Sequence, residues 1–262
     1  MPVDLITLLS PKNLIFFIIV FTRLSGMMVT IPLLSVYPIP TQIKLWFMAV
    51  VAFIIFPIVM VQVDFTVPAS MPALTVILLK EFIIGFVIGF IADIVFIGAE
   101  ISASLISMQM GLTAAQAMNP TTGDTSPILT QAYTIMVSMI FIGINGYKWI
   151  FAAIYETFKI LPPGYEFIIN GNFTNSIIVL SSKIFSIGLG LALPIFAVLF
   201  ITDVLLGFTA KMMPKMNIFM VALPVKIYIG LSVFLLIVPL MSPKIYALLE
   251  TYLGSIMKVW GG

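Results

Sequence analysis

The stretch that decides the fold runs from Lys80 to Leu112 and reads KEFIIGFVIGFIADIVFIGAEISASLISMQMGL. If it is helical from Glu81 to Gly111, it is about 46 Å long, because an α-helix rises about 1.5 Å per residue. The hydrocarbon core of a bilayer is only about 30 Å thick. The sequence therefore predicts either that this helix breaks or that it continues out of the lipid into surroundings lined by protein.

One face of this helix is small and polar. At 100° per residue, six glycine, serine and acidic residues fall on the same side. Gly85 and Gly89 add a GxxxG spacing, which lets two helix backbones approach closely. Such a face is unsuited to lipid, and we expect it to meet another helix, a partner subunit or water. The six residues are Gly89, Asp93, Glu100, Ser104, Ser107 and Gly111.

The composition of the whole chain indicates an integral membrane protein. Of its 262 residues, 61% are hydrophobic and 8% are charged, whereas about 25% of a soluble domain is charged. The net charge of +2 is too small to indicate a nucleic-acid partner. The sequence has neither cysteine nor histidine, which removes Cys or His nucleophiles, haem ligation and the usual zinc sites. We predict no enzyme activity, no cofactor and no metal site.

Long apolar stretches separated by breakers predict six membrane helices in an all-α fold. Residues 245–258 could add a terminal amphipathic helix, and the whole of residues 1–262 is interpreted as one domain. The six stretches are residues 13–36, the segment from Pro72 to about Met110, and the charge-free segments between Lys44 and Asp64, Asp124 and Lys148, Lys183 and Asp203, and Lys226 and Lys244.

Several charges lie within or at the edges of these apolar stretches. A charge at the centre of a bilayer costs about 3 kcal/mol, so such groups pair or line a cavity. They could form a proton pathway, or they could pair with each other and with partner subunits. A membrane aspartyl protease using Asp93 and Asp203 is disfavoured, because the expected Gly-x-Gly-Asp context is absent. The charges predicted to be buried are Arg23, Glu81, Asp93, Glu100, Asp203 and Lys211.

A soft segment, MQMGLTAAQAMNPTTGDTSP, follows from Met108 to Pro127. Methionine is flexible and apolar, so it conforms to whatever lies against it. The remainder of the segment is rich in small residues and in residues typical of loops. It could be an ordinary loop with its methionines in the core, or a deformable plug that seals a pore. Composition leaves both interpretations open.

Several motifs in this order resemble the FliR family of flagellar export-gate proteins and its counterpart in virulence-type type III secretion. RLSGMMVTIPLL resembles the opening helix of the family, and KEFIIGFVIGF with GAEISASLISMQMGL resembles its third. Asn145 and Gly146 match a turn after the fourth helix, although Tyr147 and Lys148 stand where histidines are common. Lys215 likewise replaces a common glutamine. The last third matches best, through Pro194, Asp203, Gly207, Pro214, Asn217, Phe219, Pro224, Lys226 and Gly230.

The resemblance implies a non-enzymatic subunit of the export gate in the bacterial inner membrane, at the flagellar basal body. Its helices would pair as hairpins inside a larger helical assembly with FliP-like and FliQ-like subunits and a FlhB-like switch protein. Unfolded flagellar proteins would pass through the shared channel. The resemblance also implies helix packing through Gly85, Gly89, Pro194, Gly207, Pro214 and Asn217, and a plug from about Met110 to Ser126 that includes Met110, Gly111, Leu112, Met118, Asn119, Pro120 and Gly123.

Two other functions remain open at this point. An independent secondary transporter would use Asp93, Glu100 and Asp203 as proton or cation sites. A purely structural scaffold would have no channel role. The overall motif match favours flagellar over virulence-type use.

Overall fold

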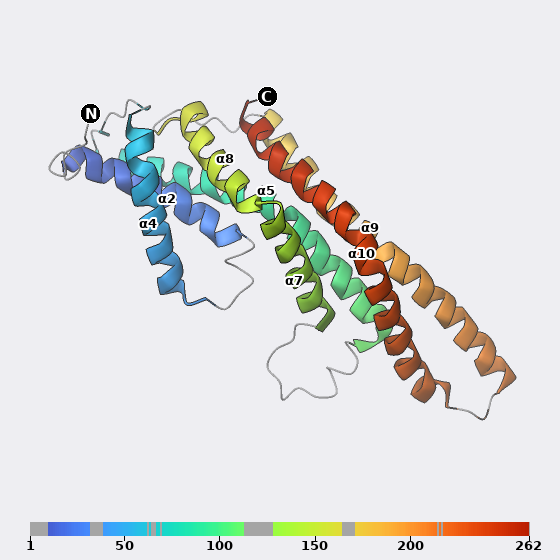
Figure 1. Ribbon diagram of the computed structural model, residues 1–262. Coiled ribbons are helices and arrows are strands. Elements are labelled where there is room, and N and C mark those ends of the chain that lie inside the picture. The colour runs from blue at the N-terminus through green and yellow to red at the C-terminus, as the bar shows by residue number, and fades with distance from the viewer. Residues whose placement is uncertain are drawn as a thin grey trace. The chain divides into compact units, whose positions relative to one another are not determined.

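The structure, a computed structural model, describes residues 10–31, 39–61, 63, 67–68, 70–112, 128–163, 171–213, 215 and 217–261. In these residues all regular structure is helical, which confirms the predicted all-α class (Figure 1). The helices are α2 (Pro11–Thr30), α4 (Thr41–Met60), α5 (Met71–Met110), α7 (Ile128–Gly143), α8 (Gly146–Ile160), α9 (Gly171–Met212) and α10 (Ile218–Gly261).

The number of candidate membrane spans agrees with the sequence. Five described helices are long and apolar enough to cross a membrane, and a sixth span results if α7 and α8 count as one broken span. Helix α8 was not predicted, and the terminal helix expected at residues 245–258 is a continuation of α10. Asn145, at the predicted turn, takes the left-handed conformation with φ of 56°, which ends one helix and starts the next.

The overlong third helix does not break. Helix α5 is continuous over 40 residues, which corresponds to about 60 Å. Helices α9 and α10 are similarly long, with 42 and 44 residues. Prolines inside these two helices do not end them. Helix α9 ends at Met212, before Pro214, which lies outside the described residues.

The chain divides into two compact units. The first unit contains α2, α4, α8, residues 71–94 of α5, the N-terminal end of α9 to residue 180, and the C-terminal end of α10 from residue 249. The second contains α7 and the remainder of α5, α9 and α10. The three long helices therefore contribute to both units. That residues 1–262 form one functional domain stays a prediction.

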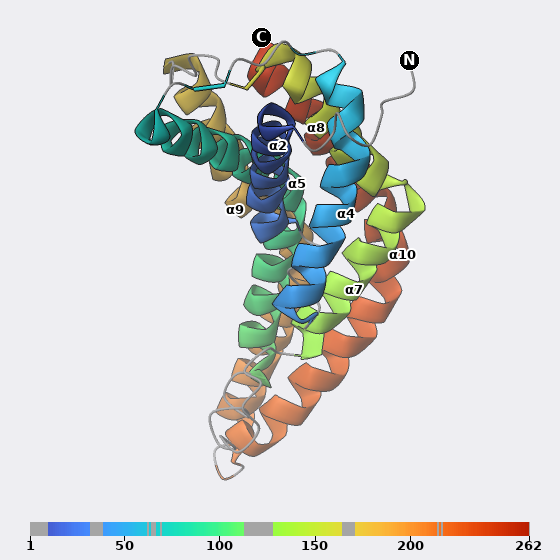
Figure 2. The same cartoon turned by 90° about the vertical axis from the view of Figure 1, so that its left-hand side faces the viewer.

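In the first unit, α2 lies against α4 and against the first part of α5 (Figure 2). Helix α2 begins at a serine cap, where Ser10 Oγ accepts a hydrogen bond from the Asn13 amide at 3.4 Å. Phe16 packs on Phe56 of α4, with ring centroids 5.8 Å apart. The crossing of α2 and α5 is close because a Cβ atom at Gly26 or Gly85 would run into the backbone of the other helix.

In the second unit, α9 and α10 form an antiparallel hairpin (Figure 1). Lys244 Nζ of α10 donates a hydrogen bond to the Gly190 carbonyl of α9 at 2.8 Å. Helix α5 crosses α9 closely, since a Cβ atom at Gly188 would lie 3.2 Å from the Gly98 carbonyl oxygen. Helix α7 joins the same core through Tyr133, whose ring lies 5.2 Å from that of Phe234.

Candidate functional site

A fully buried arginine forms the first charged centre, in the unit that contains α2 and α8. Arg23 is 0% exposed and Glu81 is 2% exposed. Arg23 Nε donates to Glu81 Oε2 at 2.5 Å, which joins α2 to α5. Because transferring an isolated charge to an apolar interior costs several kcal/mol, each of these two groups depends on the other.

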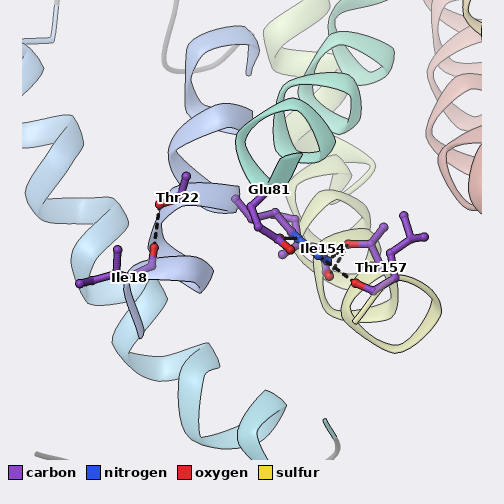
Figure 3. Close-up of polar contacts among 7 residues, drawn as sticks. Ile18, Thr22, Glu81, Ile154 and Thr157 are labelled. Carbon is purple, nitrogen blue, oxygen red and sulfur yellow. Dashed lines mark hydrogen bonds and ion pairs between the residues drawn. The ribbon is translucent and has the colours of Figure 1, made fainter. Parts of the chain in front are cut away.

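Helix α8 and Leu161, the residue that follows it, supply the rest of this centre. Arg23 Nη1 donates to Thr157 Oγ1 at 3.3 Å, and Nη2 donates to the Leu161 carbonyl at 2.9 Å. The guanidinium carbon lies 3.8 Å from the centroid of the Phe158 ring, a geometry that favours cation–π attraction. Thr157 Oγ1 in turn donates to the Ile154 carbonyl at 2.7 Å. Figure 3 shows that the side chains of Glu81 on α5 and Thr157 on α8 point toward each other.

The first centre is therefore a structural junction of three helices. Arg23 uses all three of its guanidinium nitrogens as donors within the chain, so its hydrogen-bonding capacity is directed inward. Sequence reasoning predicted Arg23 and Glu81 as buried charges. It missed Thr157 and Leu161, because a neutral hydroxyl and a backbone carbonyl leave no charge signal in an apolar stretch.

A second charged centre lies in the other unit, where α5, α9 and α10 meet. Lys226 Nζ lies 2.5 Å from Asp203 Oδ1, and Gln109 Nε2 donates to Asp203 Oδ2 at 2.8 Å. The side chains of Lys226 and Asp203 are 18% and 34% exposed. Each carboxylate oxygen thus accepts from a different helix, and α9 holds the end of α5 through one side chain. Gln109 was not predicted.

Helix α5 ends directly beside this centre. Met110 is 0% exposed and packs against Gly230 of α10, where a Cβ atom would lie 2.7 Å from the methionine sulfur. Gly111 takes a φ of 78°, and its amide donates to the Met108 carbonyl at 3.1 Å. This is a helix end with a left-handed glycine. A side chain at Gly111 would also meet Leu223 of α10.

The predicted plug segment begins at this fixed end. Met110, Gly111 and Leu112 are described by the structure. The other residues assigned to the plug lie outside the described residues, namely Met118, Asn119, Pro120 and Gly123. The structure thus shows the base from which the segment starts.

The polar face predicted for α5 has several different environments. Gly89 packs against Met27 and Thr30 of α2, and Ser107 is fully buried. Glu100 is partly buried and Ser104 is exposed. Asp93, also on this face, is partly buried and has an interaction partner. Only one part of the face is therefore open to a further partner.

The remaining predicted residues lie on α9 or at the start of α10. Lys211 is exposed, contrary to the predicted burial, because it lies one residue before the end of α9. Pro194 is exposed, and a Cβ atom at Gly207 would meet open space. Asn217 precedes α10, where its carbonyl accepts from the Met220 amide at 3.1 Å. Among the described residues, Gly207 makes no close helix contact of the predicted kind.

These observations define a class of protein, a polytopic helical membrane protein whose long apolar helices carry internally paired charges. In the described part of the chain, no cluster of three or more acidic side chains is arranged to hold a metal ion. The model of the family "Bacterial export proteins, family 1" matches residues 14–252. The chain belongs to this family.

Curated relatives agree with this assignment. The flagellar biosynthetic protein FliR of Escherichia coli K12 is 28% identical over 90% of this chain and 88% of its own length. FliR of Bacillus subtilis 168 is 28% identical over 86% of each chain. FliR of Aquifex aeolicus VF5 is 28% identical over 89% of each. The resemblance to the FliR family predicted from the sequence motifs is therefore confirmed.

Proposed function

We propose that this chain is a non-enzymatic core subunit of the flagellar protein export gate. With FliP-like and FliQ-like subunits it forms the channel through which unfolded flagellar proteins cross the bacterial inner membrane, at the basal body and beside a FlhB-like switch protein. The export family and the relatives named as flagellar biosynthetic proteins support this proposal. The chain works without a cofactor, and energy comes from other components or the proton gradient.

The observation that carries the proposal is the length of the exposed apolar helices. Large apolar side chains are exposed along α9 from Ile178 to Met212, a distance of about 51 Å. At the largest usual helix tilt of about 40°, a hydrocarbon core of about 30 Å covers only about 39 Å of helix. The hydrocarbon core alone therefore cannot cover this surface, which supports cover by other apolar protein subunits.

The plug is the second part of the proposal. Residues from about Met110 to Ser126 close the channel until a substrate displaces them. The contacts at the end of α5 support this role because they fix the start of the segment. Met110 packs on α10, and Gln109 donates a hydrogen bond to Asp203. A plug needs a fixed base and a deformable body, and methionine with small residues suits the body.

Purification of the tagged chain from its native membrane in mild detergent tests the subunit role. We expect FliP-like and FliQ-like hydrophobic subunits to remain bound, and the isolated chain in proteoliposomes to carry no solute. A chain that purifies alone and transports ions through Asp203 would contradict the proposal and favour a secondary transporter.

Deletion of Leu112 to Asp124 tests the plug separately. We expect the complex to assemble with unchanged partners while the membrane becomes permeable to ions, measured as loss of membrane potential. A matched control replaces the same residues with a scrambled segment of equal composition, which should restrict the leak more than the deletion does. An assembled deletion complex that leaves the membrane tight would contradict the plug role.

A further inference from the structure

A carboxylate on the outer face of α5 has no partner within the described part of the chain. Glu100 has neither a hydrogen bond nor an ion pair there. It lies in an open depression of about 280 Å³ on the second unit, and Ser104 and Met108 follow it at intervals of four. These residues share one helix face. The other residues that line the depression are Ile97, Ile101 and Leu105.

Three other charges on the long helices have partners within the chain. Glu81 is paired with Arg23, and Asp203 is paired with Lys226. Lys244 donates to the carbonyl of Gly190. The fold therefore satisfies these charges inside the chain, whereas Glu100 is partly buried among apolar side chains and points outward. An unpaired carboxylate in lipid costs about 3 kcal/mol, so a partner is expected.

We propose that the Glu100 surface, formed by Ile97, Glu100, Ile101, Ser104, Leu105 and Met108, binds a Lys or Arg side chain on an apolar helix of another subunit. The inference rests on the proposed function, because it requires the chain to work inside an assembly. The basic side chain pairs with the Glu100 carboxylate while apolar neighbours on its helix fill the depression. Charge complementarity within an apolar surround gives such a contact its specificity.

Two features favour a protein helix over a lipid headgroup. Three of the residues that line the depression with Glu100 are Ile97, Ile101 and Leu105, so apolar side chains of a helix can fill it while a polar headgroup cannot. Ser104 is small and exposed, and small residues let a second helix approach closely.

A photoreactive amino acid at Ser104 tests the proposal in the assembled complex in its native membrane. We expect one protein adduct with a different subunit, whose crosslinked peptide has a Lys or Arg within one helical turn of the adduct. An adduct with lipid alone, with a second copy of this chain, or with a subunit segment lacking a basic residue would overturn the proposal. The complex isolated without crosslinking provides the reference for assembly.

Charge variants then test the ion pair itself. In the photoreactive chain, Glu100→Gln keeps the shape, and Glu100→Lys reverses the charge. Loss of an interfacial charge pair should reduce the adduct about tenfold or more. Changing the mapped basic residue to Glu should restore the adduct in the Glu100→Lys chain. The control Glu156→Gln removes an exposed carboxylate that pairs with Lys159 inside the chain, and it should change nothing.

The outcomes separate this inference from the proposed function. Adduct yield that stays unchanged in both Glu100 variants, with the subunits still bound, would overturn the Glu100 surface and leave the export-gate role intact. Failure of the unmodified chain to retain any FliP-like or FliQ-like subunit would contradict the export-gate role itself.

Discussion

The two charged centres use similar chemistry in different surroundings. Arg23 and Glu81 are almost completely buried, and α8 provides further hydrogen bonds to the arginine. Asp203 and Lys226 remain partly exposed, and their centre adjoins the end of α5. Water can therefore reach Asp203 and Lys226 when their ion pair opens, whereas Arg23 and Glu81 are closed to solvent. We therefore expect the first centre to serve stability and the second to permit rearrangement.

Breaking the buried pair should have the largest effect. Arg23→Leu leaves the Glu81 carboxylate buried without its cation, and removal of one partner of a buried pair costs about 3 to 5 kcal/mol. We expect the variant to lose most of its folded population, measured by thermal denaturation in detergent with size-exclusion chromatography.

The double variant Arg23→Leu with Glu81→Leu provides the control. Because apolar residues can replace both members of a buried pair at little cost, we expect it to recover much of the lost stability. A double variant less stable than Arg23→Leu alone would contradict the assignment of the loss to an uncompensated charge.

The glycine crossing between α2 and α5 should be the next most sensitive position. Gly85→Leu places a side chain into the backbone of Arg23, and overpacking typically costs about 1 to 3 kcal/mol. Gly207→Ala is the matched control, because open space surrounds that glycine, and alanine should stabilise the helix by up to about 1 kcal/mol. Equal melting temperatures for the two variants would contradict close packing at Gly85.

The sequence predicted a site residue only where the residue type itself stands out from its neighbours in the chain. Arg23, Glu81 and Asp203 were found because a charge in an apolar stretch is conspicuous. Gln109 and Thr157 were missed, since neutral side chains acquire their importance only from the helices that fold against them. Helix α8 was missed because Lys148, Glu156 and Lys159 interrupt its apolar pattern. The sequence divided α10 at Lys244, where the charge-free segment ends, whereas in the structure that lysine donates to a carbonyl of α9 from within a continuous helix.

Asp203→Asn should separate function from stability. Asparagine has one acceptor oxygen where the carboxylate has two, so it cannot accept from both Lys226 and Gln109, and the loss should be about 1.5 kcal/mol, the value of a hydrogen bond to a charged group. We expect the complex to assemble and the ion leak to rise, because the fixed end of α5 is weakened. The membrane potential of cells that carry the wild-type gate or the Asp203→Asn gate measures the leak. Glu156→Gln should leave the potential unchanged. A tight membrane with an assembled Asp203→Asn gate would contradict a link between this centre and the plug.

The smallest effect is expected at the edge of the buried centre. Thr157→Val keeps the shape of the side chain but removes its hydroxyl, which accepts from Arg23 at 3.3 Å and donates to the Ile154 carbonyl. The loss should be about 1 kcal/mol, because Glu81 and Leu161 still hold the guanidinium. In the Arg23→Leu with Glu81→Leu background, which is expected to stay folded, the same change should cost less, since one of the two bonds is already absent. A double-mutant cycle from thermal denaturation measures this coupling. Additive losses would mean that Thr157 serves α8 alone and takes no part in holding Arg23.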